Sequence, residues 1–430
     1  MLKSNNKIGL WSAVGIGVGA MIGAGIFALM GQAGAIAGKA VYISFILGGI
    51  VAAISGYSLA KLGARFPAAG GIVEYVAQSF GVNIFSGGIS VLLYLSSIIA
   101  LALLAKAFGS YAAVLFNLKG SLIYTNVFAL SIMTILGIIQ YFGVKKVVKF
   151  QNVAIIITIT ILVGFATVGL IYLKPELMAP ALYPSSNKIL FSIAITFFSY
   201  EGFRIITHTA EDIVNPEKNL MKAIFISIGI AMVIYTALAY AVFGNLEVDK
   251  VIEAKNYALA EASKPIFGAI GFTIISITAL FSTSSSINAV LYATTNISYQ
   301  MAKDGEFPAF FAKQLGLSRV GLLVSLVVTG LLILFLDLLQ IAAVGSITVL
   351  FIHAVTHLGH LKIIDQTRAS KFLVVTALLT TLTVIALFLI YSIKDSYTIL
   401  FLFVGILALS FLLEFISRLI INRKVAKSNP

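Results

Sequence analysis

Glycine is concentrated in one apolar stretch near the N-terminus. Five glycines occupy the eleven positions 15–25, inside a segment (8–38) that carries no charged residue. Each glycine weakens a helix by about 1 kcal/mol relative to alanine, so we expect a membrane-spanning helix to break there. A break exposes backbone N–H and C=O groups, which at membrane depth are tolerated only where protein or a cavity surrounds them. The stretch therefore predicts a binding site.

Three other interpretations of this stretch are open. Residues 15–20 fit the dinucleotide-binding pattern G-x-G-x-x-A, but no predicted strand precedes them and the next acidic residue is Glu74. Gly15, Gly19 and Gly23 form small-xxx-small pairs, which are typical of close helix packing and compatible with a binding site. A secretory signal peptide is disfavoured because the apolar run is too long, so we expect a retained membrane anchor.

A second apolar segment carries a similar interruption. The motif Phe-Ser-Tyr-Glu-Gly-Phe at 198–203 places a glycine beside a carboxylate in the middle of an apolar run. If the first ten spans form two repeats of five, the two interruptions occupy corresponding positions, and the odd number inverts the second repeat. Such a pair is the best sequence indication of a transporter site. The alternative is two unrelated glycine kinks.

The composition is that of a polytopic membrane protein. Of 430 residues, 60% are hydrophobic and 10% are charged, against about 25% charged in soluble domains. Cysteine is absent, which excludes disulfides and thiolate metal sites. A net charge of +13 raises the possibility of a nucleic-acid partner, but most Lys and Arg residues fall on one side of the predicted membrane topology. We therefore expect no nucleic-acid partner, and both termini in the cytoplasm.

Twelve apolar segments are predicted to cross the membrane. They lie near 9–32, 40–63, 83–116, 122–142, 147–173, 188–211, 220–243, 265–302, 320–337, 339–362, 372–392 and 397–417. The eighth segment is uncharged over its whole length and is too long for an upright span, so we expect it to be tilted or partly re-entrant.

Several motifs occur in the order found in one superfamily of transporters. They are Gly-Ala-Met-Ile-Gly-Ala-Gly-Ile-Phe at 19–27, Phe-Pro-Ala-Ala-Gly-Gly at 66–71 with Tyr75, the motif at 198–203 with Ala-Glu-Asp-Ile-Val-Asn-Pro at 210–216, and Met-Ala-Lys-Asp-Gly-Glu-Phe-Pro at 301–308. In these motifs the chain resembles the amino acid–polyamine–organocation (APC) superfamily of amino acid permeases.

The resemblance implies an all-α polytopic fold of about twelve transmembrane helices. It would be a LeuT-like arrangement of five-plus-five inverted repeats in which helices 1 and 6 are broken. A transporter core (1–365) would contain repeats near 9–173 and 188–362, and residues 366–430 would add two helices and a short cytoplasmic tail. The implied function is secondary active transport of amino acids or related amines across the plasma or inner membrane by alternating access, without a cofactor.

The resemblance also places the substrate at the two breaks. Backbone N–H groups of Ala24 and Gly25 would hold the substrate carboxylate, which agrees with the anion preference of a helix N-terminus. Carbonyl groups of both breaks would accept from the amino group, with Phe198 and Tyr200 as aromatic walls. The implied substrate-binding residues are Met21, Ile22, Gly23, Ala24, Gly25, Phe198, Ser199, Tyr200, Glu201 and Gly202.

The coupling cation could be H⁺ or Na⁺. Thr158 stands where some proton-coupled relatives carry a lysine, and Asn296 replaces an arginine. The hydroxyl run at 282–286 suits Na⁺, although helix packing with back-bonding to carbonyls also explains it. Glu201, in a low dielectric, is a candidate proton carrier. We expect proton coupling, with Na⁺ symport or exchange as alternatives; the candidate ion-coupling residues are Glu201, Thr158, Ser282, Thr283, Ser285 and Ser286.

Two further cations lie within predicted spans, where charge is costly and therefore suggests function. We expect the Lys106 side chain to reach outward toward the membrane surface. We expect Arg204 to pair with a carboxylate across the helix bundle.

Three histidines share one face of the tenth segment. His353, His357 and His360 are spaced i, i+4 and i+7, and Asp365 is the one carboxylate nearby in the sequence. A metal site needs further ligands, so we expect no metal and predict that these histidines line an inner vestibule.

Two other classes of function fit the sequence less well than a transporter. A membrane-embedded enzyme needs a nucleophile–base pair or a metal constellation, and no compact set of that kind is evident. An ion channel needs a filter repeated among subunits or internal copies, whereas the two interruptions differ.

Overall fold

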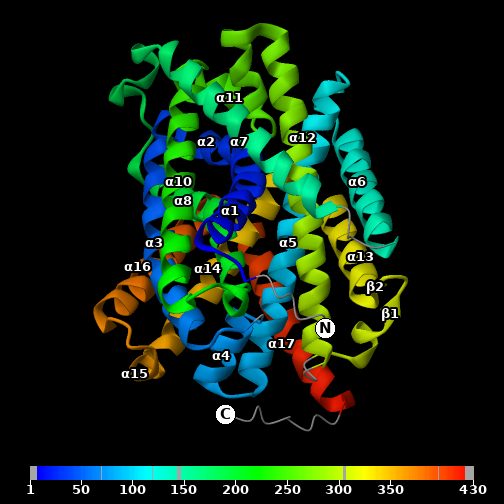
Figure 1. Ribbon diagram of the computed structural model, residues 1–430. Coiled ribbons are helices and arrows are strands. Elements are labelled where there is room, and N and C mark those ends of the chain that lie inside the picture. The colour runs from blue at the N-terminus through cyan, green and yellow to red at the C-terminus, as the bar shows by residue number, and fades with distance from the viewer. Residues whose placement is uncertain are drawn as a thin grey trace.

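The computed structural model describes residues 7–68, 70–118, 120–142, 147–303, 307–395 and 397–421 (Figure 1). The side chains of Ala24, 147–154, 394–395 and 420–421 lie outside this description, as do residues 304–306 of the motif at 301–308.

The described chain is almost entirely helical. Its first half contains α1 (Leu10–Met21), η1 (Ile22–Ile26), α2 (Phe27–Ala37), η2 (Gly38–Ala40), α3 (Val41–Arg65), α4 (Ile72–Phe80), α5 (Ile84–Leu115), α6 (Leu122–Phe142), α7 (Val147–Ile171), η3 (Pro175–Met178), η4 (Pro180–Leu182) and α8 (Ser186–Tyr200). Its second half contains η5 (Glu201–Phe203), α9 (Arg204–Thr207), η6 (Ala210–Asp212), α10 (Pro216–Phe243), α11 (Val248–Glu253), α12 (Ala258–Lys303), η7 (Ala309–Ala312), β1 (Gln314–Leu315), β2 (Ser318–Arg319), α13 (Val320–Phe335), α14 (Leu338–Lys362), α15 (Ile364–Thr367), α16 (Lys371–Asp395) and α17 (Tyr397–Ile421). The two short strands pair antiparallel.

Nine helices in the described part of the chain are long and apolar enough to cross a membrane, and three shorter apolar helices accompany them. This is the architecture of a polytopic membrane protein. The long eighth segment differs from its predicted bounds, because α12 begins at Ala258 and continues through Pro265. Gly268 has φ +64°, so α12 is two helices joined at a kink that glycine permits.

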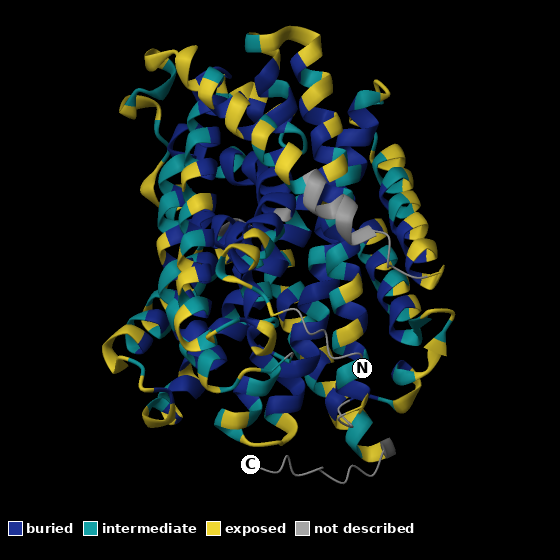
Figure 2. Cartoon of the chain, in the orientation of Figure 1, coloured by how far each residue is buried: buried dark blue, intermediate teal, exposed yellow. Residues whose placement is uncertain are grey.

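Burial separates inner helices from outer ones (Figure 2). Helix α5 is buried along most of its length, whereas α6 and α17 expose many large apolar side chains. Helix α3 packs against α8, α10, α14 and α16, and α14 packs against α5 and α8. The inner helices therefore enclose the two segments in which the sequence predicts interruptions.

Both predicted interruptions fall where the helix changes type. After Met21 the chain forms the π-helix η1 before α2 continues. After Tyr200 it forms the single 3₁₀ turn η5, followed by the short helix α9. The breaks are milder than the sequence suggests, since the backbone stays helical, as a π-helix at η1 and a 3₁₀ turn at η5. Single π-turns within α-helices occur frequently at functional sites.

Each irregular turn packs through a glycine against the helix that precedes the other turn. A Cβ built at Gly202 would lie 2.5 Å from the Met21 backbone nitrogen, and one built at Gly25 would lie 2.5 Å from the Ser199 carbonyl oxygen. At each of these contacts one backbone packs directly against another.

Backbone hydrogen bonds also join the ends of the two irregular helices. The Ile8 N–H donates to the Asp212 carbonyl (2.8 Å), and the Val214 N–H donates to the Ile8 carbonyl (3.0 Å). The entry to α1 and the segment after α9 are therefore held side by side. These bonds fix the relative position of the two segments beyond their glycine contacts.

The glycine contacts can be tested by stability. Gly202→Ala and Gly25→Ala should each destabilise the protein by about 1–3 kcal/mol, the usual cost of overpacking, because a methyl group would press on backbone atoms. Thermal unfolding of the purified protein in detergent measures the effect. Gly15→Ala is the control, since nothing lies within 4 Å of a Cβ there. Equal unfolding temperatures for the Gly15, Gly25 and Gly202 variants would contradict the close packing.

Candidate functional site

A buried carboxylate lies at the second interruption. Glu201 opens η5 and is 9% exposed. One of its carboxylate oxygens accepts from the Arg204 Nε at 2.5 Å, and the other lies 3.1 Å from the His353 Nε2. Arg204 was predicted to pair across the bundle, but its partner is three residues away in the same segment. The partner from another helix is instead His353 on α14.

The three histidines of α14 are packed inside the protein. His353, His357 and His360 are each 0% exposed, so the prediction that they line an inner vestibule is wrong. Their ring nitrogens meet hydroxyl groups of Ser55 and Ser58 on α3 at 2.6–3.0 Å. Helix α3 covers this face of α14, which explains the burial.

Sequence reasoning did not single out Ser55 and Ser58. Their spacing of three residues places them on one face of α3, which is a local signal. Their partners lie about 300 positions further along the chain, and only the packing of α3 on α14 brings them together.

The implied substrate-binding residues are gathered around the two interruptions. Those with described side chains are buried, apart from the partly exposed Gly202. The Tyr235 hydroxyl donates to the Ser199 carbonyl (3.2 Å), and the Ser199 hydroxyl reaches the Gly25 carbonyl (3.5 Å). The side chain of Ala24 lies outside the described residues. The structure therefore brings the set together in a closely packed state.

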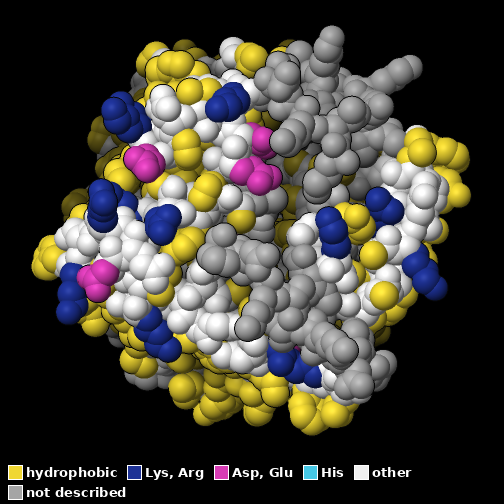
Figure 3. Space-filling view, turned by 60° about the horizontal axis from the view of Figure 1, so that its bottom comes forward, with side chains coloured by type: hydrophobic (Ala, Val, Ile, Leu, Met, Phe, Trp, Pro, Cys, Tyr) yellow, Lys and Arg dark blue, Asp and Glu magenta, His cyan; other side chains and the backbone are white. Residues whose placement is uncertain are grey.

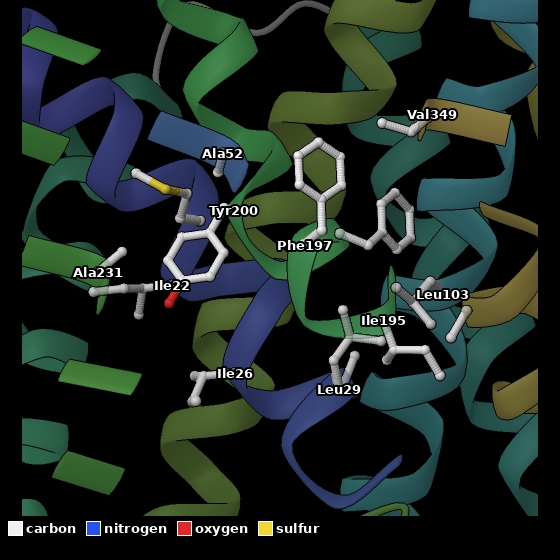
Figure 4. Packing of buried hydrophobic residues seen from close by; sticks show 14 of the residues in the cluster. Ile22, Ile26, Leu29, Ala52, Leu103, Ile195, Phe197, Tyr200, Ala231 and Val349 are labelled. Carbon is white, nitrogen blue, oxygen red and sulfur yellow. The ribbon is translucent and has the colours of Figure 1, made fainter. Parts of the chain in front are cut away.

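Two aromatic side chains of this set pack against helices on either side. The Tyr200 hydroxyl donates to the Phe45 carbonyl of α3 at 2.8 Å, and its ring lies among buried apolar side chains (Figure 4). The Phe198 ring packs against Gly345 of α14, where a built Cβ would lie 2.8 Å away. Both rings occupy helix interfaces here, and their role as walls of a substrate site stays a prediction.

The candidate ion-coupling hydroxyls lie in different surroundings. A Cβ built at Gly23 would overlap the Ser286 hydroxyl and lie 3.4 Å from the Ser282 carbonyl, so this part of α12 faces η1. Thr283 instead donates to the Ala279 carbonyl of its own helix (2.6 Å), as back-bonding predicts. Thr158 is buried on α7, a helix that packs against α12, and Ser285 is partly exposed.

Lys106 does not extend outward as predicted. It is 2% exposed, and its Nζ donates to the Asn126 side chain at 2.7 Å. Helix α6 covers this face of α5, which closes the outward route. The side chain lines a cavity of about 270 Å³ together with Asp337 and Lys255.

Comparison with known sequences agrees with this architecture. The sequence pattern of the family described as amino acid permease matches residues 8–429. The chain belongs to the amino acid permease family. This agrees with the resemblance to the APC superfamily seen in the motifs.

Relatives of this permease extend over most of its length. It is 38% identical to uncharacterized protein MJ0609 of Methanocaldococcus jannaschii, over 99% of this chain and 98% of that protein. It is 32% identical to inner membrane transport protein YbaT of Escherichia coli, over 91% of each chain. It is 30% identical to the methylthioribose transporter of Bacillus subtilis, over 69% of this chain and 67% of that one. The last two are named as transporters, not enzymes.

The ion pair between Arg204 and Glu201 leads to a prediction for a double variant of this permease. Arg204→Ala should destabilise the protein by about 3–5 kcal/mol, because it leaves the Glu201 carboxylate buried with less compensation. Adding Glu201→Gln should recover part of that loss, as thermal unfolding in detergent would show. Lys264→Ala, which breaks the partly exposed Lys264–Glu261 pair, is the control and should cost less than about 1 kcal/mol. No recovery in the double variant would show that the two side chains act independently.

Proposed function

We propose that this permease is a secondary active transporter that imports amino acids or related amines by alternating access and is coupled to protons. The family assignment supports the substrate class. The observation that carries the coupling is the buried Glu201 carboxylate, which lies in an irregular helical segment and meets both Arg204 and His353. A buried ionisable group at such a place is a functional candidate, since its charge is costly in an apolar bundle.

The proposal includes a LeuT-like arrangement of about twelve membrane spans. Its core would be residues 1–365, with inverted repeats near 9–173 and 188–362, and 366–430 would add two helices and a cytoplasmic tail. The changes of helix type at η1 and η5 support it, because they fall in the first and sixth predicted spans. Irregular helices at corresponding positions are typical of transporters built from inverted repeats.

The substrate would bind between η1 and η5 once these segments separate. In the packed state described here, Gly25 brings η1 against α8 and Gly202 brings η5 against α1, each backbone to backbone. The backbone groups freed in η1 would then face the substrate carboxylate, and the carbonyls of η5 would face its amino group. The packed state would be one member of an alternating cycle.

Na⁺ coupling is the second candidate. Ser282 and Ser286 border η1, and Thr158 is buried on a neighbouring helix, so oxygen ligands are available near the first interruption. Hard cations prefer such ligands. Exchange of one amino acid for another, with no net ion movement, is compatible with the same site.

Transport by reconstituted protein tests the proposal. Proteoliposomes would be given L-leucine, L-serine or L-arginine, under either an imposed pH gradient or an imposed Na⁺ gradient. We expect the pH gradient to drive accumulation and Glu201→Gln to abolish it, because the variant cannot carry a proton. Glu414→Gln is the matched control, since Glu414 is also buried and paired with an arginine one turn away, on α17.

Two outcomes would contradict proton coupling. Accumulation that depends on Na⁺ alone and persists in Glu201→Gln would transfer the coupling role to Thr158, Ser282 and Ser286. Transport of none of the three amino acids would contradict the substrate class.

The orientation of the chain is proposed from its charges, with both termini in the cytoplasm. The excess of Lys and Arg in the predicted loops on that side supports this direction, and Figure 3 shows Lys and Arg side chains spread over the end of the molecule that it brings forward. Single cysteines at Asn187 and Lys313, both exposed, would report it in a chain without native cysteine. An impermeant maleimide should label Asn187→Cys in intact cells, and Lys313→Cys only after permeabilisation. The opposite pattern would reverse the orientation.

A further inference from the structure

An unbroken series of hydrogen bonds leads away from Glu201 through the interior. From the Glu201 carboxylate it passes to His353 (3.1 Å), then to Ser55 (2.6 Å) and His357 (2.9 Å). It continues from His357 to Ser58 at 3.0 Å.

The remaining links lead to the end of the helix. They run from Ser58 to His360 (2.8 Å) and from His360 to Thr367 (2.8 Å). Histidines of α14 thus alternate with hydroxyl groups of α3, and the last hydroxyl belongs to α15. Every group in the series can both give and receive a proton.

The directions of these bonds follow from counting hydrogens. A neutral histidine has one N–H and one acceptor nitrogen, and a hydroxyl has one hydrogen to donate. If Glu201 is ionised, the His353 Nε2–H donates to it, so the Ser55 hydroxyl must donate to the His353 Nδ1. The same count repeated at His357, Ser58 and beyond makes every donor point toward Glu201.

The opposite polarity satisfies the same contacts. If Glu201 carries a proton, its O–H donates to the His353 Nε2 and every later bond reverses. The His360 Nε2–H then donates to Thr367, whose hydroxyl is free to donate to the Ile364 carbonyl at 2.9 Å. The two states differ by one proton and use the same heavy-atom positions.

The surroundings exclude water along most of the series. Ser55, Ser58 and the three histidines are 0% exposed. The His353 ring is held edge-on between Phe197 and Phe203, at 5.5 and 5.8 Å between ring centroids. These contacts fix the ring with its two nitrogens directed at Glu201 and Ser55.

The far end of the series reaches the surface. Thr367 is 7% exposed, and its neighbours Gln366 and Arg368 are exposed, in the short segment that contains α15 (Figure 1). Under the proposed topology this is the cytoplasmic side.

Charged groups flank the series at its two ends. Arg204 and Glu201 stand at the buried end. At the other end Lys61 lies one turn after Ser58 on α3, and Lys362 and Asp365 are exposed near the end of α14 and on α15. The interior of the series carries histidines and hydroxyls from α3 and α14.

We propose that these residues form a proton relay connecting Glu201 with the surface at Thr367. The inference rests on the proposed proton coupling and extends it by assigning the release path. Under the proposed topology, the relay delivers to the cytoplasm the proton that Glu201 carries.

The relay step conserves atoms and charge. The Glu201 O–H bond breaks as its proton bonds to the His353 Nε2, while the His353 Nδ1–H proton passes to Ser55 and the Ser55 proton passes to the His357 Nε2. The same exchange repeats through Ser58 and His360, and the Thr367 proton leaves to water. Each hydroxyl gains one proton as it loses another, so no free alkoxide forms, and each histidine changes tautomer.

The test interrupts the relay without removing a histidine. Ser55→Ala deletes the one hydroxyl between His353 and His357. Accumulation driven by a pH gradient should fall about 100-fold, the scale of a lost proton-transfer group. Exchange of labelled for unlabelled amino acid needs no net proton release and should persist. The probe is whichever of L-leucine, L-serine and L-arginine the wild type exchanges fastest, and Ser58→Ala should behave in the same way.

A serine outside the relay provides the control. Ser44 lies on the same helix, is equally buried, and bonds to the Ile189 carbonyl and the Ser192 hydroxyl. Ser44→Ala makes the same chemical change and should retain both accumulation and exchange.

Failure of the relay is distinguishable from failure of proton coupling. If the wild type does not accumulate substrate in a pH gradient, both proton coupling and the relay are wrong. If the wild type accumulates substrate and both Ser55→Ala and Ser58→Ala do so equally well, the relay alone is wrong.

A measurement on the unaltered protein covers the case in which both variants fail to fold. In D₂O, net uptake through the relay should slow more than exchange, because only net uptake depends on a series of proton transfers. Equal slowing of the two activities would overturn the relay.

Discussion

A carboxylate inside an apolar helix bundle is stable only when nearby groups compensate its charge. Glu201 obtains this compensation from Arg204 in its own segment and from His353 on α14. The first contact holds the irregular turn η5 in shape, and the second joins it to a helix far away in the sequence. Because the next groups after His353 belong to α3, the same requirement also brings α3 and α14 into register.

The packing around η1 and η5 depends on glycine, which has no side chain. Gly25 allows η1 to meet the backbone of α8, Gly202 allows η5 to meet the backbone of α1, and Gly23 leaves room for the Ser286 hydroxyl of α12. The residues proposed to bind the substrate are therefore closely packed against one another. Glycine here serves close packing, which is one of the interpretations of the sequence, and the substrate site proposed at the same place stays a prediction.

Local sequence patterns predicted the features that depend on residues close together in the chain. Apolar runs indicated the helices, the glycines and Glu201 marked both irregular turns, and the spacing of His353, His357 and His360 placed them on one face. Features set by distant segments were missed. Lys106 is buried because α6 covers it, Tyr200 turns toward the Phe45 carbonyl, and the histidines meet serines from another helix. The spacing of Ser55 and Ser58 puts them on one face of α3, but the nearby sequence identifies none of these contacts.

The alternation of imidazoles and hydroxyls also limits how many protons the series could pass in succession. After one proton has passed, every ring has exchanged its tautomer and every hydroxyl points the opposite way, so a second proton cannot follow by the same route. The series must first be restored: each hydroxyl must rotate and each ring must turn over, because resetting the tautomers by proton transfer would carry the proton back. His353 is held edge-on between two phenylalanine rings, which oppose such a turn in this packing. If the series acts as the proposed relay, it would therefore carry one proton and then need the packing around His353 to loosen before the next.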